Sequence, residues 1–223
     1  EGGAAVRGPG GRGAVLAGGL LLALAACGGP RTYLVNLQYR PGAAPEQQPG
    51  PLPSVAVNFF ADVRERPDRV KIGTLTGPRG GTDAFIPARL GVDEVVTQAV
   101  ATTFAKRGHA VKEIQGWDLT PANAQPAWGD VLVGGQIQEF WITGERAILN
   151  TKTTAQVRLK ALAVASRTRE VLWEGTVSAA AESTDVLFSD EQVAATASRA
   201  LSRALDLFLA NPQFLSRLKG VGP

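Results

Sequence analysis

The single cysteine of the chain, Cys27, is the residue whose neighbours most clearly predict a chemical modification. It follows Leu24, Ala25 and Ala26 at the end of an apolar run. This spacing of a leucine, two small residues and a cysteine matches a bacterial lipobox. In a lipobox the thiol receives a diacylglyceryl group, a signal peptidase cuts before the cysteine, and the new amino group is acylated. The pattern therefore predicts a lipid, with chains such as palmitate, on Cys27.

Residues 1–26 have the three parts of a secretory signal. Arg7 and Arg12 supply the positive region, an apolar run of roughly a dozen residues leads to Leu24, and small residues end the segment. The run is shorter than the roughly 20 residues that an ordinary transmembrane helix needs. We therefore predict a cleaved signal peptide over residues 1–26. The alternatives are an uncleaved signal anchor and cleavage at an ordinary signal-peptidase site.

An acylated Cys27 would be a lasting membrane anchor, because two or more acyl chains hold a protein stably on a bilayer. Gly28 follows the cysteine, where an aspartate would resemble the inner-membrane retention signal of enteric bacteria. We therefore expect the mature protein on the outer membrane, facing the periplasm.

The other candidates for chemistry are weaker. His109 is the only histidine, and it follows the glycine expected to end a helix, where a capping or surface role is simplest. A histidine-based zinc site needs more than one imidazole. The stretch Gly77–Gly81 lacks the lysine and hydroxyl of a phosphate-binding loop, and Pro78 has no N–H to offer a phosphate. We therefore predict no metal, no cofactor and no enzymatic activity.

The charge pattern gives no sign of nucleic-acid binding. The chain has 23 basic and 20 acidic residues, a formal net charge of +3, and the two signs are interspersed. The expected partners are the membrane, through Cys27, and a protein of the cell envelope, with no nucleic acid. With one cysteine the domain has no internal disulfide, so its stability must come from burial.

The hydrophobic pattern predicts one α+β domain over residues 54–219, preceded at 27–53 by a lipidated tether and a proline-rich linker. Within that stretch, residues 33–39 are either an edge strand or part of the tether. Strands are predicted at 54–60, 70–75, 109–114, 130–142, 154–164 and 171–179, with a turn at 144–146. Helices are predicted at 92–107, from Ser189 to the Asn211-Pro212 stop, and in a short segment beginning at Pro212.

This order of elements predicts a two-layer sandwich. A largely antiparallel sheet would carry the two main amphipathic helices on one face, and its other face would meet water or a partner.

Two tryptophans are candidates for contact with that partner. Trp117 and Trp128 lie in the loop predicted at 115–129, and exposed aromatic side chains are frequent at interaction hot spots. Packing of the loop onto the sheet is the alternative, and it is the interpretation we favour.

Five segments carry a resemblance to a known family. They are residues 104–111 (FAKRGHAV), 130–133 (DVLV), the strand at 155–163, residues 171–175 (VLWEG), and the late helix before Phe214. Together they resemble the YajG-type lipoproteins over roughly Val55 to Leu218. The resemblance implies an outer-membrane lipoprotein with no assigned enzymatic activity.

The sequence thus predicts a lipid-anchored envelope lipoprotein whose periplasmic domain binds or scaffolds a partner. The alternative is an auxiliary lipoprotein subunit of an envelope transporter, of the lipid or ABC type. Such a subunit would bind lipid or glycolipid in a groove between the helices and the sheet.

Overall fold

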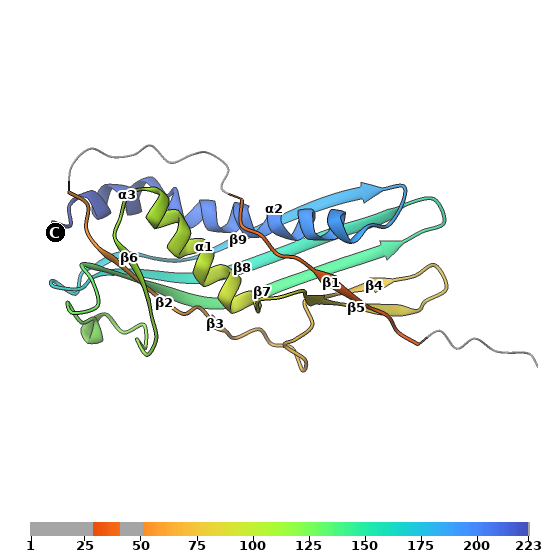
Figure 1. The fold of residues 1–223 in the computed structure, drawn as a ribbon, viewed down its shortest axis with the longest axis horizontal. Helices are drawn as coiled ribbons and strands as arrows, with labels where there is room; N and C mark the ends of the chain where they lie inside the picture. Colours follow the sequence, from red (N-terminus) through yellow and green to blue (C-terminus); the bar gives the residue numbers. More distant parts are fainter. Residues whose placement is uncertain (1–28, 41–50, 223) are drawn as a thin grey trace, which may run out of the picture.

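Three long strands form the central part of the molecule. The computed structural model describes residues 29–40 and 51–222, and in it β7 (Val131–Arg146), β8 (Thr151–Ala165) and β9 (Val171–Asp185) lie side by side (Figure 1). β8 is antiparallel to both of its neighbours. Up to Ala161 the side chains of β8 alternate between core and solvent, as the sequence predicts for a strand with one wet side.

The second edge of β7 is occupied by three short strands, one after another. β2 (Val55–Asn58), β3 (Ala61–Asp62) and β4 (Gly73–Thr76) each run parallel to it. The sheet is completed by β5 (Thr82–Pro87) beside β4, β1 (Thr32–Val35) beside β5, and β6 (Val111–Ile114) beside β2. One long strand therefore organises both halves of the sheet.

The predicted two-layer sandwich with a largely antiparallel sheet is wrong. Among the described residues, five of the eight strand pairings are parallel, and the nine strands form one mixed, curled sheet. The physical reason is that the chain leaves the β7 edge after each short strand and returns in the same direction. The three antiparallel pairings are those of the β4–β5 hairpin and of the two long hairpins, β7–β8 and β8–β9.

The helices lie close to their predicted positions. They are α1 (Val92–Lys106), α2 (Asp190–Leu209) and α3 (Pro212–Lys219), with a 3₁₀ turn, η1, at Pro121–Asn123. The hydroxyl of Ser189 accepts a hydrogen bond from the backbone N–H of Gln192 and begins α2. The side chain of Asn211 accepts hydrogen bonds from two N–H groups of the first turn of α3, which Pro212 opens.

Aromatic side chains fill the space between the helices and the sheet. Phe104 of α1, Phe208 of α2 and Phe214 of α3 are 0–1% exposed. Phe208 lies 5.1 Å from Phe214 and 4.6 Å from Trp173 of β9, measured between ring centroids. Close packing of this kind fills the space around these rings between the helices and the sheet.

A smaller core covers part of the opposite sheet face. Its buried members are Ala56, Trp117, Ala124, Leu132, Leu162 and Val164. The loop at 115–129 therefore packs over the first residues of β7, and the first five residues of that strand are all buried. Burial on both faces removes the alternation expected of a half-solvated sheet at this end.

Two local predictions are settled by strand pairing. Residues 32–35 form β1, an edge strand parallel to β5, so this segment belongs to the sheet and not to a tether. The predicted turn at 144–146 is wrong, because β7 continues to Arg146 and the chain turns at 147–150. Gly144 instead allows close approach, since a Cβ there would lie 2.7 Å from the Cδ1 of Leu75.

Candidate functional site

A hollow of about 430 Å³ is lined by residues at the start of β7, at the end of β8 and on α3. These three elements meet at one end of the molecule (Figure 1). The charged lining of the hollow consists of Asp130, Arg167, Glu170 and Arg217. Ala165, Leu172 and Val221 add apolar surface, and Thr168 adds a hydroxyl. Hollows of this volume, with apolar walls and a few polar groups, are typical of sites for small ligands or short peptide segments.

Three of the four charged side chains of this hollow, those of Asp130, Arg167 and Arg217, make polar contacts with the protein. A guanidinium nitrogen of Arg167 lies 3.3 Å from Oδ1 of Asp130. Arg217 donates a hydrogen bond from Nη1 to the carbonyl oxygen of Val171, at 3.0 Å. Arg217 therefore ties α3 to the beginning of β9.

Asp130 is kept ionised by its neighbours. Hydrogen bonds from the hydroxyl and the backbone N–H of Ser54, together with the charge of Arg167, lower its pKa below the ordinary value, although partial burial acts the other way. The hollow thus combines fixed carboxylate and guanidinium groups. Guanidinium groups bind carboxylates and carbonyl oxygens, and carboxylates accept hydrogen bonds from N–H groups. The lining is therefore suited to a polar ligand that has both hydrogen-bond acceptors and hydrogen-bond donors.

The predicted site residues do not gather at this hollow. His109 is 8% exposed and packs edge-on against Phe104. Its Nδ1 donates to the carbonyl oxygen of Pro53 at 2.8 Å, because a carbonyl can only accept. Burial is the main cause that lowers the pKa of His109, and the charge of Arg107 adds to it. The residue fastens the segment before β2 to the end of α1, so its side chain is neither the cap of a helix nor the surface group that the sequence predicts.

Trp117 and Trp128 pack against the small core under the loop. Trp117 is 4% exposed, and its indole N–H donates to the carbonyl oxygen of Thr120 at 3.0 Å. Asn58 fixes its backbone from both sides, donating to the carbonyl and accepting from the N–H. Trp128 is partly buried in the same cluster. In this conformation Trp117 offers almost no surface to a partner, so loop packing describes it better than an exposed anchor.

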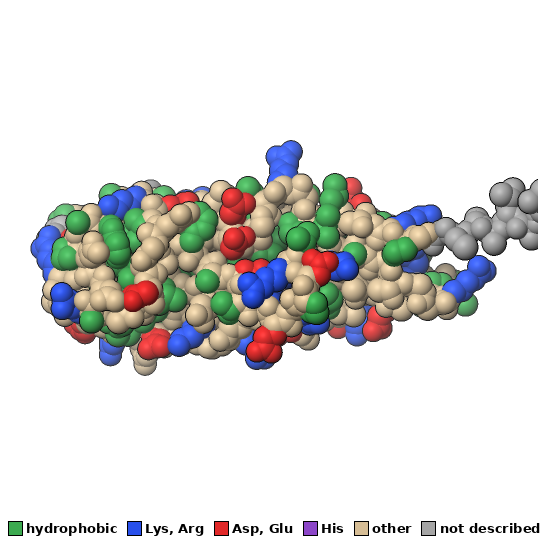
Figure 2. Space-filling model, turned by 90° about the horizontal axis from the view of Figure 1, so that it is seen from below, with side chains coloured by type: hydrophobic (Ala, Val, Ile, Leu, Met, Phe, Trp, Pro, Cys, Tyr) green, Lys and Arg blue, Asp and Glu red, His purple; other side chains and the backbone are tan. Residues whose placement is uncertain are grey.

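Cys27 and the signal peptide lie outside the described residues, so the modification predicted there stays a prediction. In the described part of the chain, no helix has both the length and the apolar character to cross a membrane. Histidine, cysteine and carboxylate groups do not cluster there in threes as a metal site would require. On the face seen in Figure 2, acidic and basic side chains are interspersed and no basic stripe forms.

The hollow was missed by sequence reasoning. Residues 167–169 lie between the strands predicted at 154–164 and 171–179, and Arg217 follows in the short helical segment predicted from Pro212. The only sequence feature that points to the hollow is the position of four charged residues near the ends of predicted elements: Asp130, Arg167, Glu170 and Arg217. The antiparallel order of the three predicted strands would bring Asp130, Arg167 and Glu170 to one end, but nothing in the sequence places Arg217 beside them.

No protein-family model matches the chain, and neither does any curated protein. Solved structures do resemble it. A Xanthomonas campestris protein described by the family model DUF330 superposes with a TM-score of 0.55 at 15% identity, over 85% of this chain and 97% of that one. A Helicobacter pylori protein described as a neuraminyllactose-binding hemagglutinin homologue gives 0.46 at 8% identity, over 83% and 100%. A lipoprotein of Neisseria meningitidis gives 0.29 at 20% identity, over 71% and 99%.

Only the first of these superpositions is close enough to show a shared fold. It extends over most of this chain and nearly all of the other, so this chain shares its overall fold with the Xanthomonas campestris protein. None of the three singles out the YajG-type lipoproteins, and that likeness stays a resemblance in sequence pattern.

Proposed function

We propose that this protein is a lipid-anchored component of the bacterial envelope, carried on the outer membrane, whose folded part is a non-enzymatic binding domain facing the periplasm. The observation that carries the proposal is the lipobox-like sequence Leu24-Ala25-Ala26-Cys27 at the end of a signal-like leader. The candidate for the binding site is the hollow lined by Asp130, Arg167, Glu170 and Arg217.

The geometry supports this division of roles between two ends of the domain. Cys27 stands five residues before Thr32, where β1 begins, and five extended residues span at most about 18 Å. The hollow lies at the opposite end of β7, a strand of 16 residues that is about 50 Å long. An anchor at Cys27 would therefore present the hollow to the periplasm, away from the lipid.

The anchor would act by confinement. A tethered domain meets its partner at a high effective concentration, provided that the tether can span the distance. Residues 41–53, the proline-rich linker, were expected to set this reach. However, they connect β1 and β2, which belong to one sheet, so the short segment before β1 sets it instead.

The anchor is tested by fractionation of cells that produce the full chain. Cys27→Ser should move the protein from the membrane fraction to the soluble fraction, or leave it unprocessed with its leader attached. Gly28→Ser is the matched control, because it changes the neighbouring residue and keeps the thiol. A processed Cys27→Ser protein that still floats with membranes at the level of the control contradicts the proposal.

The binding role is tested by site-specific photocrosslinking in cells. A photoreactive residue at Thr168, on the rim of the hollow, should give a discrete adduct that disappears when Arg217→Ala is added. Gln156, exposed in the middle of β8, is the control position. Equal adducts at both positions, or an adduct that survives the loss of Arg217, would rule out the hollow as the binding site.

A further inference from the structure

Several strand ends and loops meet at the end of the molecule that is opposite the hollow. β4 and β7 both end there, since Thr76 pairs with Glu145. β8 begins and β9 ends there, since Thr151 pairs with both Arg146 and Asp185. β1 begins beside β5 at the same end (Figure 1). The turn at 147–150 and the loop at 186–189 are therefore neighbours.

These two loops carry the most exposed large apolar side chains of the described residues. Ile148 is 91% exposed and Leu149 is 80% exposed in the β7–β8 turn. Val186 and Leu187 are 81% and 80% exposed in the loop between β9 and α2. Single exposed apolar residues are ordinary on protein surfaces, whereas several gathered at one end commonly mark an interaction surface. We call these four residues the apolar tip.

The apolar tip stands on a firmly packed base. Phe188, directly after Leu187, packs against Tyr33 of β1 at 4.8 Å between ring centroids. The guanidinium of Arg146 lies over the ring of Phe188, 4.7 Å from its centroid. Ala147 donates to the carbonyl oxygen of Asn150 at 2.8 Å and closes the other loop. The loops are thus held in place while their apolar side chains point outward.

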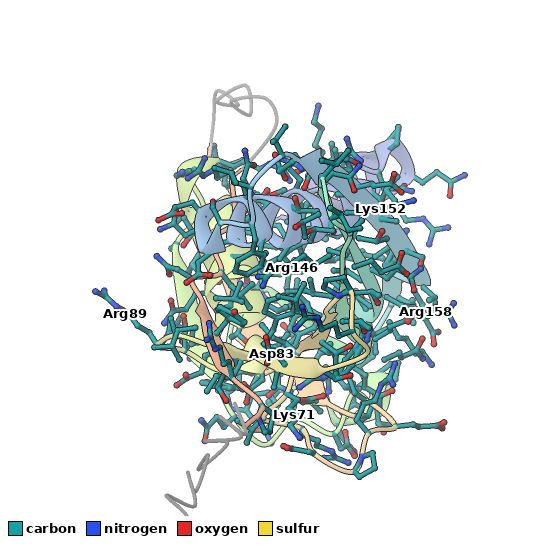
Figure 3. The ribbon with its side chains drawn as sticks, turned by 90° about the vertical axis from the view of Figure 1, so that its right-hand side faces the viewer. Lys71, Asp83, Arg89, Arg146, Lys152 and Arg158 are labelled. Atoms are coloured by element: carbon teal, nitrogen blue, oxygen red, sulfur yellow. The ribbon has the colours of Figure 1, made fainter. Side chains whose placement is uncertain are left out.

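Charges around the tip are nearly balanced. The basic residues on the strand ends and turns here are Arg31, Arg79, Arg146 and Lys152, and the acidic ones are Asp83, Glu145 and Asp185. Figure 3 views the molecule from this end, with Asp83, Arg146 and Lys152 projecting from three different strands. This surface therefore has exposed apolar side chains and no strong electrostatic potential of one sign.

We infer that the apolar tip inserts into the interfacial region of the bilayer that holds the Cys27 lipid. The inference deepens the proposed function and rests on it, because the anchor brings lipid to this end. Cys27 stands within about 18 Å of the start of β1, and Tyr33 of β1 contacts Phe188 at the base of the tip. The lipid and the tip would then fix the domain upright, with the hollow facing away from the membrane.

Lipid is a better occupant of this surface than a protein partner on two grounds. The four residues of the tip are all aliphatic, without the aromatic side chains that are enriched at the core of protein interfaces. The chain upstream also leads from this same end to the residue that carries the anchor. Because the surrounding charges nearly balance, insertion should not require anionic lipid.

The test uses the mature lipoprotein, in which Cys27 is acylated and an introduced cysteine is the only free thiol. Leu149→Cys, Leu187→Cys and the control Gln156→Cys are each labelled with a polarity-sensitive fluorophore. Each protein is reconstituted into vesicles of phosphatidylethanolamine and phosphatidylglycerol, and separately into pure phosphatidylcholine. Quenching by lipids with nitroxides on their acyl chains is then measured.

Labels at Leu149 and Leu187 should shift to shorter wavelength and be quenched several-fold more strongly than the label at Gln156, in both lipid mixtures. If the protein stays on the vesicles but all three labels are quenched alike, the inference fails and the anchor stands. If the tip labels are shielded from water yet not quenched by lipid, a second copy or another protein covers the tip, and the inference fails too. Loss of the protein from the vesicles overturns the anchor and, with it, the insertion.

Discussion

Asp130 and Ser54, 76 residues apart, are joined by three hydrogen bonds. Oδ2 of Asp130 accepts from the hydroxyl of Ser54 at 2.7 Å and from its backbone N–H at 2.9 Å. The hydroxyl oxygen of Ser54 accepts in turn from the N–H of Asp130 at 3.0 Å. Because β2 and β7 begin directly after these residues, the pair sets the register of the parallel strands beside the hollow.

We predict that Asp130→Ala lowers the free energy of unfolding by about 1–3 kcal/mol, the usual cost of leaving partly buried hydrogen-bonding groups without a partner. Asp118→Ala is the control, because Asp118 is an exposed loop residue whose carboxylate also accepts hydrogen bonds. Urea unfolding at neutral pH measures both. An equal, small loss for the two variants would contradict the role given to the pair.

The same pair predicts an acid response. The pKa of Asp130 is lower in the folded protein than in the unfolded chain, chiefly because of the Ser54 hydroxyl. Its contribution is therefore complete above the unfolded pKa of about 3.9 and is lost as the pH falls further. Asp130→Asn should reduce the slope of stability against pH below about 4, and an unchanged slope would argue against it.

Among the arginine, lysine, aspartate and glutamate residues that the structure describes, Arg64 is the least exposed. Only 3% exposed, it pairs with Asp62 at 2.8 Å and donates to the backbone carbonyl oxygens of Arg69, Lys71 and Phe140. It therefore fastens the loop between β3 and β4 to β7.

We predict that Arg64→Ala costs about 3–5 kcal/mol, because the carboxylate of Asp62 and the three carbonyl oxygens lose their donor together. Arg64→Lys should also destabilise the protein, since an ammonium group cannot reproduce the fork of a guanidinium. Arg89→Ala, at an exposed position, serves as the control in thermal unfolding. Equal midpoints for Arg64→Ala and Arg89→Ala would show that the network does not contribute to stability.

The elements whose positions are predicted well from the sequence are those that have one buried face and one exposed face. α2 has an apolar stripe and a serine cap, and β8 alternates over most of its length, so both lie close to their predicted ranges. β7 begins with five buried residues because a helix layer and the 115–129 loop cover both of its faces. β5 was missed, since Phe85 is its only fully buried residue and the strand shows no clear alternation.

The mixed topology could not be predicted for a different reason. Which strands pair with the second edge of β7 depends on contacts between residues far apart in the chain, and no local pattern encodes them. The hollow has another origin, because Asp130, Arg167 and Arg217 are brought together by the β7–β8–β9 hairpins and by the docking of α3 on the start of β9. The modification at Cys27, by contrast, can be predicted without knowledge of the fold, because its signal is contained in four consecutive residues, and it stays a prediction.

Gly135 of β7 tests the close packing of the sheet. A Cβ at this position would overlap the carbonyl oxygen of Lys160 and lie 2.6 Å from a ring carbon of Phe60. Backbone on a paired strand cannot move aside easily, so we predict that Gly135→Ala lowers the free energy of unfolding by more than about 2 kcal/mol.

Gly81→Ala is the matched control for that change, because nothing lies within 4 Å of its Cβ position. It should leave stability unchanged or raise it slightly. Denaturant unfolding distinguishes the two variants, and a tolerated Gly135→Ala would mean that β7 and β8 can separate locally without cost.

His109 predicts a second pH response, in a milder range. Its pKa is lowered in the folded protein, mainly by burial, so the unfolded chain binds the proton more readily. Stability should therefore fall as the pH drops below about 6.5, the unfolded value, towards the folded value. His109→Asn keeps a donor for the Pro53 carbonyl oxygen and should remove this part of the pH dependence. A stability profile that is identical in the two proteins between pH 7 and pH 5 would contradict this account.

The most direct test of the whole account is the mass of the N-terminal fragment of the protein purified from cell membranes. We expect a mature chain that begins at Cys27 and carries a diacylglyceryl group on its sulfur and an acyl chain on its amino group. Metabolic labelling with a palmitate analogue should mark the wild type and Gly28→Ser, but not Cys27→Ser. An N-terminal fragment with a free thiol at Cys27, or with residues of the leader still attached, would contradict the anchored position from which the proposed functions of both ends follow.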